Sequence, residues 1–165
     1  MTSKLKTDIL ETVSGSGTIA LTNQLSGMTS ASMPSGSVVQ VKTFTTDTTG
    51  YVTSTSASYV DSDLVLTITP TSTSSKILIT AELGSQTQAN VGNYCGIFRD
   101  GTQIGSDYIF HNADYMVFQL HMETVDSPST TSELTYRIKA KVSSGTFYVH
   151  HADRNNTLTL TEIKG

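Results

Sequence analysis

Strict alternation of apolar and polar residues is the feature that most limits what this chain can fold into. It is clearest at residues 133–142, ELTYRIKAKV, where an apolar side chain stands at every second position and threonine, arginine or lysine falls between. Successive side chains of a β-strand point to opposite faces of the sheet. The segment therefore predicts a strand whose Leu134, Tyr136, Ile138, Ala140 and Val142 face a core while its basic residues face water.

The same two-residue period recurs along the chain and predicts roughly eight to ten strands. In KILITAEL the period places Ile77, Ile79, Ala81 and Leu83 on the inward face. In LVLTITP it places Leu64, Leu66 and Ile68 on one face. In DYMVFQLHMETV it places Met116, Phe118, Leu120 and Met122 on one face. Between two apolar runs, Asp100-Gly101 predicts a type I′ hairpin turn, since both central residues of that turn need positive φ. Many short strands joined by polar turns are typical of a sandwich.

Composition supports an all-β chain. Only 15% of the residues are charged and 36% are hydrophobic, while threonine, serine and glycine are abundant. A disordered chain normally carries a high net charge, and threonine, valine and isoleucine suit a pleated surface. We expect an antiparallel jelly-roll sandwich over residues 37–165, preceded by an extended arm and stalk over residues 1–36.

The arm contains small apolar islands within a Gly- and Ser-rich stretch, at Ile19 to Leu21 and at Leu25 and Met28. Such a segment is too short to bury these islands alone, whereas three chains wound together would bury them. Residues 1–13 suit a short helix or an extended arm equally well. Apolar residues also fall on the second face of several predicted strands, which favours a subunit interface; these are Val65, Leu78, Tyr115, Val117 and Tyr148.

The order of segments resembles the C-terminal domains of tailed-phage structural proteins, above all fibre-type proteins of marine and cyanobacterial phages. The resemblance covers about residues 35–165 and depends on the Thr-rich first strands, ITPTSTSSKILI, FRDGTQIGS, DSPSTTSELTYRIKAKV and the terminal NNTLTLTEIKG. It implies a trimeric jelly-roll head similar to the tumour-necrosis-factor fold. No long repetitive shaft precedes the head, which favours a short fibre, a spike tip, or a collar or head-decorating fibre.

Several partners are not expected. The net charge is −4 and the basic residues are scattered, whereas a nucleic-acid binder needs a basic stripe. No stretch approaches the ~18 apolar residues of a membrane span, and the start of the chain lacks the core of a signal peptide. The single cysteine, Cys95, suits a small buried hydrophobe and a protein made in the host cytoplasm before it joins the virion.

Catalytic and metal-binding motifs are weak. His150 and His151 are neighbours and would point to opposite faces of a strand, although three copies of one histidine could bind a metal on a trimer axis. Asp61 with Asp63, or Asp107 with Asp114, could serve a glycosidase, but aspartates commonly form turns. We expect no enzyme activity and no cofactor.

Carbohydrate recognition fits the remaining polar and aromatic loop residues. Two segments, residues 86–94 and 108–115, supply the candidate contact residues Asn90, Asn93, Tyr94, Tyr108, His111, Asn112 and Tyr115. The predicted function is a virion structural protein, a short phage fibre whose exposed trimeric head binds host-surface polysaccharide and whose arm docks on other virion proteins. The alternatives are a capsid-decorating, collar or joining protein without a receptor, and a polysaccharide-degrading enzyme.

Overall fold

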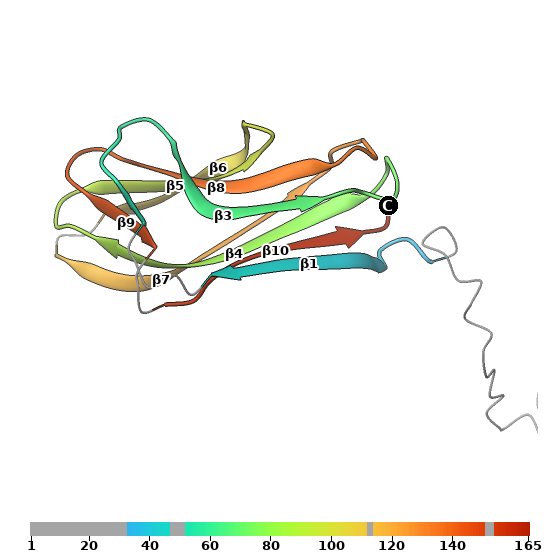
Figure 1. The fold of residues 1–165 in the computed structure, drawn as a ribbon, viewed down its shortest axis with the longest axis horizontal. Helices are drawn as coiled ribbons and strands as arrows, with labels where there is room; N and C mark the ends of the chain where they lie inside the picture. The colour runs from blue at the N-terminus through green and yellow to red at the C-terminus, as the bar shows by residue number, and fades with distance from the viewer. Residues whose placement is uncertain (1–32, 47–51, 112–113, 151–153) are drawn as a thin grey trace, which may run out of the picture. The chain divides into compact units, whose positions relative to one another are not determined.

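The computed structural model describes residues 33–46, 52–111, 114–150 and 154–165. They belong to one compact unit that runs from Met33 to Gly165. Two antiparallel β-sheets face each other across a core, and the described residues contain no helix (Figure 1). The all-β class predicted from the two-residue period is confirmed, whereas the arm predicted for residues 1–36 lies outside the described residues up to residue 32.

Ten strands make up the two sheets. Sheet A contains six: β1 (Val38–Thr46), β2 (Val52–Ser54), β4 (Lys76–Thr87), β7 (Met116–Asp126), β9 (Phe147–His150) and β10 (Asn156–Ile163). Sheet B contains four: β3 (Val60–Ile68), β5 (Gly92–Arg99), β6 (Thr102–His111) and β8 (Leu134–Val142).

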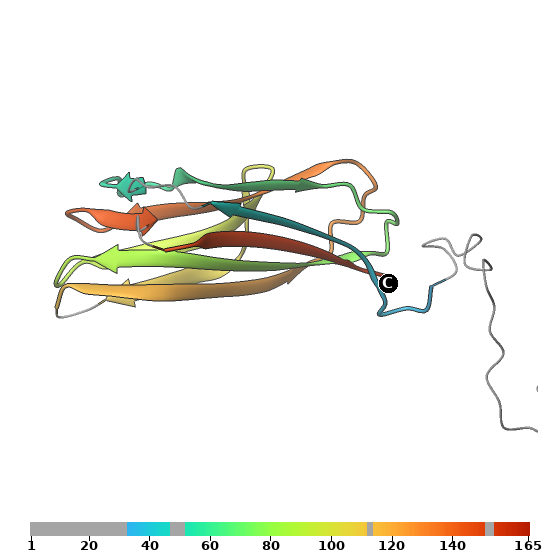
Figure 2. The same ribbon diagram turned by 60° about the horizontal axis from the view of Figure 1, so that its bottom comes forward.

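The strand order is that of a jelly roll. Sheet A has β1, β10, β4 and β7 side by side. Beyond the end of β10, the short β9 pairs with β4 at Gln86, and β2 pairs with β9. Sheet B has the order β3, β8, β5, β6. The chain changes sheet at every connection from β2 to β5 and from β6 to β9, while β5 and β6 form a hairpin within sheet B (Figure 2). These repeated crossings between two antiparallel sheets confirm the predicted jelly-roll sandwich.

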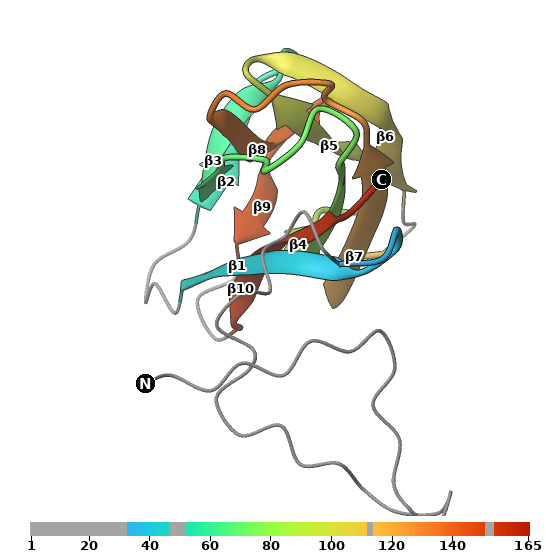
Figure 3. The ribbon, with the colours of Figure 1, turned by 90° about the vertical axis from the view of Figure 1, so that its right-hand side faces the viewer.

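The core lies between the sheets, as the end-on view shows (Figure 3). Ile79, Ile138 and Leu160 are 0% exposed, and Leu64 and Ile68 are also buried. The alternating residues of β8 follow the prediction without exception, since its five inward side chains are all buried. Cys95 is buried too, and burial raises the pKa of its thiol, so it behaves as a small apolar residue.

One predicted inward face is only partly buried. Leu120 and Met122 of β7 enter the core, but Phe118 is half-buried and Met116 is 42% exposed. Within the described residues, β7 pairs only with β4, and β6 is likewise the last strand of sheet B. The two free edges meet beside each other (Figure 3), and no further strand covers the start of β7 there.

The turn between β5 and β6 has the predicted geometry. Asp100 has φ of 48° and Gly101 has φ of 85°, which is the left-handed pair that a type I′ turn requires. Asp100 also donates its backbone N–H to Thr135 O at 2.9 Å and accepts the Thr135 N–H on Oδ1 at 2.9 Å. The turn is therefore tied to the neighbouring strand β8.

A buried carboxylate accepts hydrogen bonds from the hydroxyl-rich connection between β3 and β4 and holds it in place. Glu162 of β10 is 0% exposed. It accepts hydrogen bonds from Gln40 Nε2 at 2.6 Å, from the Thr71 backbone N–H at 2.7 Å and from Thr71 Oγ1 at 2.8 Å. Burial alone would raise the pKa of Glu162, but these hydrogen bonds outweigh it and hold the pKa below its ordinary value.

A second buried carboxylate links the two sheets. Asp126, at the end of β7 in sheet A, accepts a hydrogen bond from Tyr136 OH of β8 at 2.7 Å and lies 2.6 Å from Arg99 Nη1 of β5. Tyr136 is fully buried, so its hydroxyl needs such a partner. The contact fixes one end of sheet B against sheet A.

Candidate functional site

The outer face of sheet B gathers the basic residues of β8. Arg137, Lys139 and Lys141 point away from the core because their neighbours Tyr136 and Ile138 are fully buried on the other face. In the pairing register Arg137 lies opposite Phe98 of β5, Lys139 opposite Gly96, and Lys141 opposite Tyr94. Aromatic and cationic side chains therefore meet on one surface.

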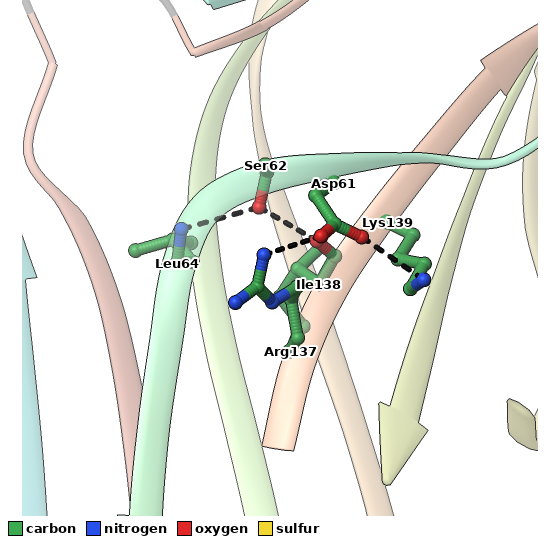
Figure 4. Close-up of polar contacts among 6 residues, drawn as sticks. All are labelled: Asp61, Ser62, Leu64, Arg137, Ile138 and Lys139. Carbon is green, nitrogen blue, oxygen red and sulfur yellow. Dashed lines mark hydrogen bonds and ion pairs between the residues drawn. The ribbon is translucent and has the colours of Figure 1, made fainter. Parts of the chain in front are cut away.

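A β-bulge in β3 shapes this surface. Asp61 pairs with Lys139 and Val65 pairs with Arg137, so four steps along β3 match two steps along β8. Ser62 lies within the extra segment and is buried. Its hydroxyl donates to the Ile138 carbonyl at 2.7 Å and accepts the Leu64 N–H at 3.2 Å (Figure 4). The serine thereby satisfies backbone groups that the bulge leaves without their ladder partners.

The bulge places the Asp61 carboxylate between two cations. Asp61 Oδ2 accepts a hydrogen bond from Arg137 Nη1, and Oδ1 lies 2.9 Å from Lys139 Nζ (Figure 4). The hydrogen bond from Lys139 and the positive charges of both bases outweigh partial desolvation and lower the pKa of Asp61. The carboxylate is 49% exposed, so water screens the pair, and its contribution is to hold three charged groups in fixed positions.

Two aromatic rings lie beside these charges. Tyr59 and Phe98 meet edge to face with ring centroids 5.0 Å apart, and Lys139 Nζ lies 5.1 Å from the Phe98 centroid. A Cβ on Gly96 would come within 3.0 Å of the Phe98 ring and 3.4 Å of the Tyr59 hydroxyl. The missing side chain at Gly96 leaves the space that the two rings need.

A second charged group lies beside the first on this face. Asp107 Oδ1 accepts hydrogen bonds from Tyr59 OH at 2.7 Å and from Gln103 Nε2, while Oδ2 lies 3.4 Å from Lys141 Nζ. The hydrogen bonds from Tyr59 and Gln103, with the nearby Lys141, lower the pKa of Asp107, and burial together with Asp107 raises that of Tyr59. Lys141 Nζ also lies 4.4 Å from the Tyr59 ring centroid.

A pocket of about 250 Å³ opens between the bulge and the β5–β6 turn. Its lining combines two carboxylates, two cations, one aromatic ring and turn backbone. The lining residues are Asp61, Phe98, Asp100, Gly101, Thr135, Arg137 and Lys139. We call this hollow the polar pocket.

A different hollow lies where the edges of β6 and β7 meet. This apolar groove, of about 360 Å³, is lined by Ile109, Phe110, His111, Met116 and Phe118. The Phe110 and Phe118 rings lie 5.2 Å apart. Ile109 is 60% exposed, which is unusual for so large an aliphatic side chain.

The structure separates the candidate residues predicted from the two loops. Asn93 is 0% exposed and donates to Val91 O at 2.9 Å, because its position in β5 faces the core rather than the surface of a loop. Tyr94 is half-buried, and Lys141 Nζ lies 5.0 Å from its ring centroid. Asn90 is exposed with φ of 58° in the connection between β4 and β5.

The second predicted segment, residues 108–115, includes the end of β6 and contributes one of its candidate residues to the apolar groove. His111 lines it, while Tyr108 is half-buried, with its hydroxyl donating to Glu123 O and accepting the Glu123 N–H at 3.0 Å. Tyr115 is 59% exposed and its hydroxyl accepts a hydrogen bond from Gln86 Nε2. Asn112 lies outside the described residues. Those candidate residues that the structure describes therefore form no single site.

The sequence did not predict a binding site at the polar pocket, because each of its residues has an ordinary explanation in sequence. Arg137 and Lys139 fit the water-facing side of a strand, and Asp61 fits a turn. The signal was the irregular stretch Asp61-Ser62-Asp63 immediately before the regular alternation of β3, since a break in the two-residue period marks a bulge.

At both Asp61 and Asp107 the surroundings favour the charged carboxylate. A glycosidase needs one carboxylic acid whose pKa is raised, so that it holds a proton near neutral pH. The pKa values of Asp61 and Asp107 are both lowered. Among the described residues no group of three or more His, Cys, Asp or Glu side chains is arranged to hold a metal ion, and no helix there has the length and apolarity to cross a membrane.

Comparison with known proteins gives distant structural likenesses. No family model and no curated protein matches the sequence. Among solved structures, the VP2 subviral particle of infectious bursal disease virus matches with a TM-score of 0.44 and 14% identity over 78% of this chain. The Gx strain of that virus matches with 0.40 and 15%, also over 78%. The present chain spans only 38% and 39% of those two chains, and matches this distant assign no family.

Proposed function

We propose that this chain is a virion structural protein, a short phage fibre whose jelly-roll head forms a homotrimer and attaches to host-surface glycans. The observation that carries the proposal is an antiparallel jelly roll with two separate kinds of outer surface. One is apolar and suits contact between protomers, and the other is a charged, aromatic pocket that suits a polar ligand. The segment order that resembles phage fibres points the same way.

The protomer contact is proposed at the β6–β7 edge. Ile109, Tyr115, Met116 and Val117 are between 37% and 60% exposed there. Two free strand edges beside an apolar groove are a ready surface for another protein chain. We commit to a second copy of this chain as the partner.

A three-fold ring needs a second, different patch, because its contacts are heterologous. The outer face of sheet A offers one. Val41, Thr161, Leu78 and Val125 lie opposite one another in a row across β1, β10, β4 and β7. Val41 is 56% and Val125 53% exposed. In the proposed trimer this row packs against the β6–β7 edge of the next protomer.

Replacing Val117 with aspartate should dissociate the trimer. A carboxylate buried in an apolar contact without a partner costs several kcal/mol, which is comparable with the free energy of a modest interface. Light scattering at low micromolar concentration should report three chains for the parent and one for the variant. Thr131→Asp adds the same charge at an exposed position in the connection between β7 and β8, outside both patches, and should leave the trimer intact. A parent protein that is monomeric at this concentration would overturn the trimer.

The location on the particle tests the function itself. Labelled antibody against the head, viewed by electron microscopy of intact virions, should mark a tail tip, collar or vertex with the head exposed. Labelling only after the particle is broken open would favour the alternative of a joining protein buried between other components. Release of oligosaccharides from host polysaccharide by the purified protein would move the function to an enzyme.

A further inference from the structure

The polar pocket has a lining whose charges cancel. Asp61 and Asp100 supply two negative charges, and Arg137 and Lys139 supply two positive ones. A ligand with a strong charge of either sign would therefore meet a charge of the same sign in the pocket. An anion would also have to displace Asp61, which already lies between both cations.

The same lining offers every kind of contact that a sugar ring uses. Carboxylate oxygens accept hydrogen bonds from hydroxyl groups, and guanidinium and ammonium groups donate to hydroxyl and ring oxygens. Phe98 adds an apolar wall for the carbon-bound face of the ring. A compact ligand covered with hydroxyls satisfies donors, acceptors and the aromatic ring together.

The walls of the pocket are held in place without a ligand. Ser62 fixes the bulge that carries Asp61. Two hydrogen bonds with Thr135 fix Asp100, and Tyr59 packs against Phe98. Groups that are already ordered lose little conformational entropy when they bind, which favours even a small ligand.

Size limits the ligand to one ring. The pocket measures about 250 Å³, slightly below the ~300–1,000 Å³ of sites that enclose drug-sized molecules. We infer that the polar pocket binds a single neutral pyranose unit at the exposed end or branch of a host-surface glycan. This inference rests on the proposed attachment function, and names the site and sugar class for it.

Titration of the full chain with simple glycosides tests the site. The probes are methyl glucoside, methyl mannoside and methyl galactoside, followed by amide chemical shifts in ¹H–¹⁵N NMR spectra. With at least one of them, shifts should saturate in the millimolar range and map to residues 98–101 and 135–139. Shifts confined to residues 109–118 would place the sugar in the apolar groove and overturn the inference.

Two matched variants test the mechanism. Asp61→Asn should weaken binding of the neutral glycoside by about tenfold or more, since it removes a charged acceptor. The same variant should bind methyl glucuronide more tightly than the parent does, because Arg137 and Lys139 lose their counter-ion. Glu82→Gln removes the charge of a carboxylate on sheet A, outside the pocket lining, and should change neither affinity. Tighter binding of methyl glucuronide than of every neutral probe by the parent would contradict the neutral class.

An assay of attachment to host cells distinguishes an error in the assigned glycan site, the polar pocket, from an error in the proposed attachment function. Parent trimers that attach to cells while Asp61→Asn trimers do not would support both. Equal attachment by parent and variant would overturn the polar pocket as the glycan site and leave the attachment function standing. Absence of both cell attachment and glycoside shifts would overturn both.

Discussion

Alanine in place of Ile79 or Ile138 should lower the free energy of unfolding by about 2 to 5 kcal/mol. Both side chains are 0% exposed and belong to the core, Ile79 from sheet A and Ile138 from sheet B. Truncation removes buried methyl groups and leaves a cavity that strands paired on both sides cannot easily close. In a head of this size the loss corresponds to a fall in melting temperature of roughly 5 to 15 °C.

Val65→Ala is the control for these two variants. Val65 is half-buried on the outer face of β3, so its truncation removes aliphatic surface without opening a core cavity. We expect Val65→Ala to lower the free energy of unfolding by less than half as much as Ile79→Ala or Ile138→Ala does. All variants need comparison at one protein concentration, because assembly adds to apparent stability. If Ile79→Ala and Ile138→Ala melt like the parent, the assignment of inner and outer faces is wrong.

Glutamine in place of Glu162 should cost about 3 kcal/mol at pH 7. The substitution keeps the shape but removes a buried charge that accepts hydrogen bonds from Gln40 and from both the N–H and the hydroxyl of Thr71. Hydrogen bonds to a charged group contribute more than neutral ones, and a broken buried contact leaves donors unsatisfied. Urea unfolding at fixed protein concentration measures the loss.

The difference in unfolding free energy between the parent and Glu162→Gln should depend on pH in the direction set by the lowered pKa of Glu162. Glu162 has a folded pKa below its ordinary value, so its stabilising contribution is fully present above about pH 4.3. The contribution is lost as the pH falls through the lowered folded pKa. The gap between parent and Glu162→Gln should therefore be constant from pH 5 to 7 and should narrow in stronger acid.

Glu82→Gln provides the matched comparison. Glu82 lies on β4, its side chain is 42% exposed, and it contacts His121 on the solvent-facing surface. Its substitution should change stability by no more than about 1 kcal/mol. Two outcomes would contradict the role assigned to the buried carboxylate. One is a stability loss for Glu162→Gln that grows below pH 4. The other is a loss at pH 7 equal to that of Glu82→Gln.

The strands, their buried faces and the hairpin turn were predictable from the amino-acid sequence alone. The five inward residues of β8 and the four of β4 were predictable because a strand exposes alternate side chains to opposite faces, which is a local rule. The turn at Asp100-Gly101 was predictable for a similar reason, since positive φ at two successive residues restricts the residue types. These features depend on a few neighbouring positions.

Only the tertiary structure decided which polar residues meet. The Asp61 carboxylate lies between Arg137 and Lys139 because a bulge shifts β3 against a strand whose Arg137 is 76 residues further along the chain. Glu162 meets Thr71, which is 91 residues away, and no local pattern contains that contact. Alternation assigns a residue to a face, but the register between distant strands determines its neighbours on that face, and the polar pocket is made of such neighbours.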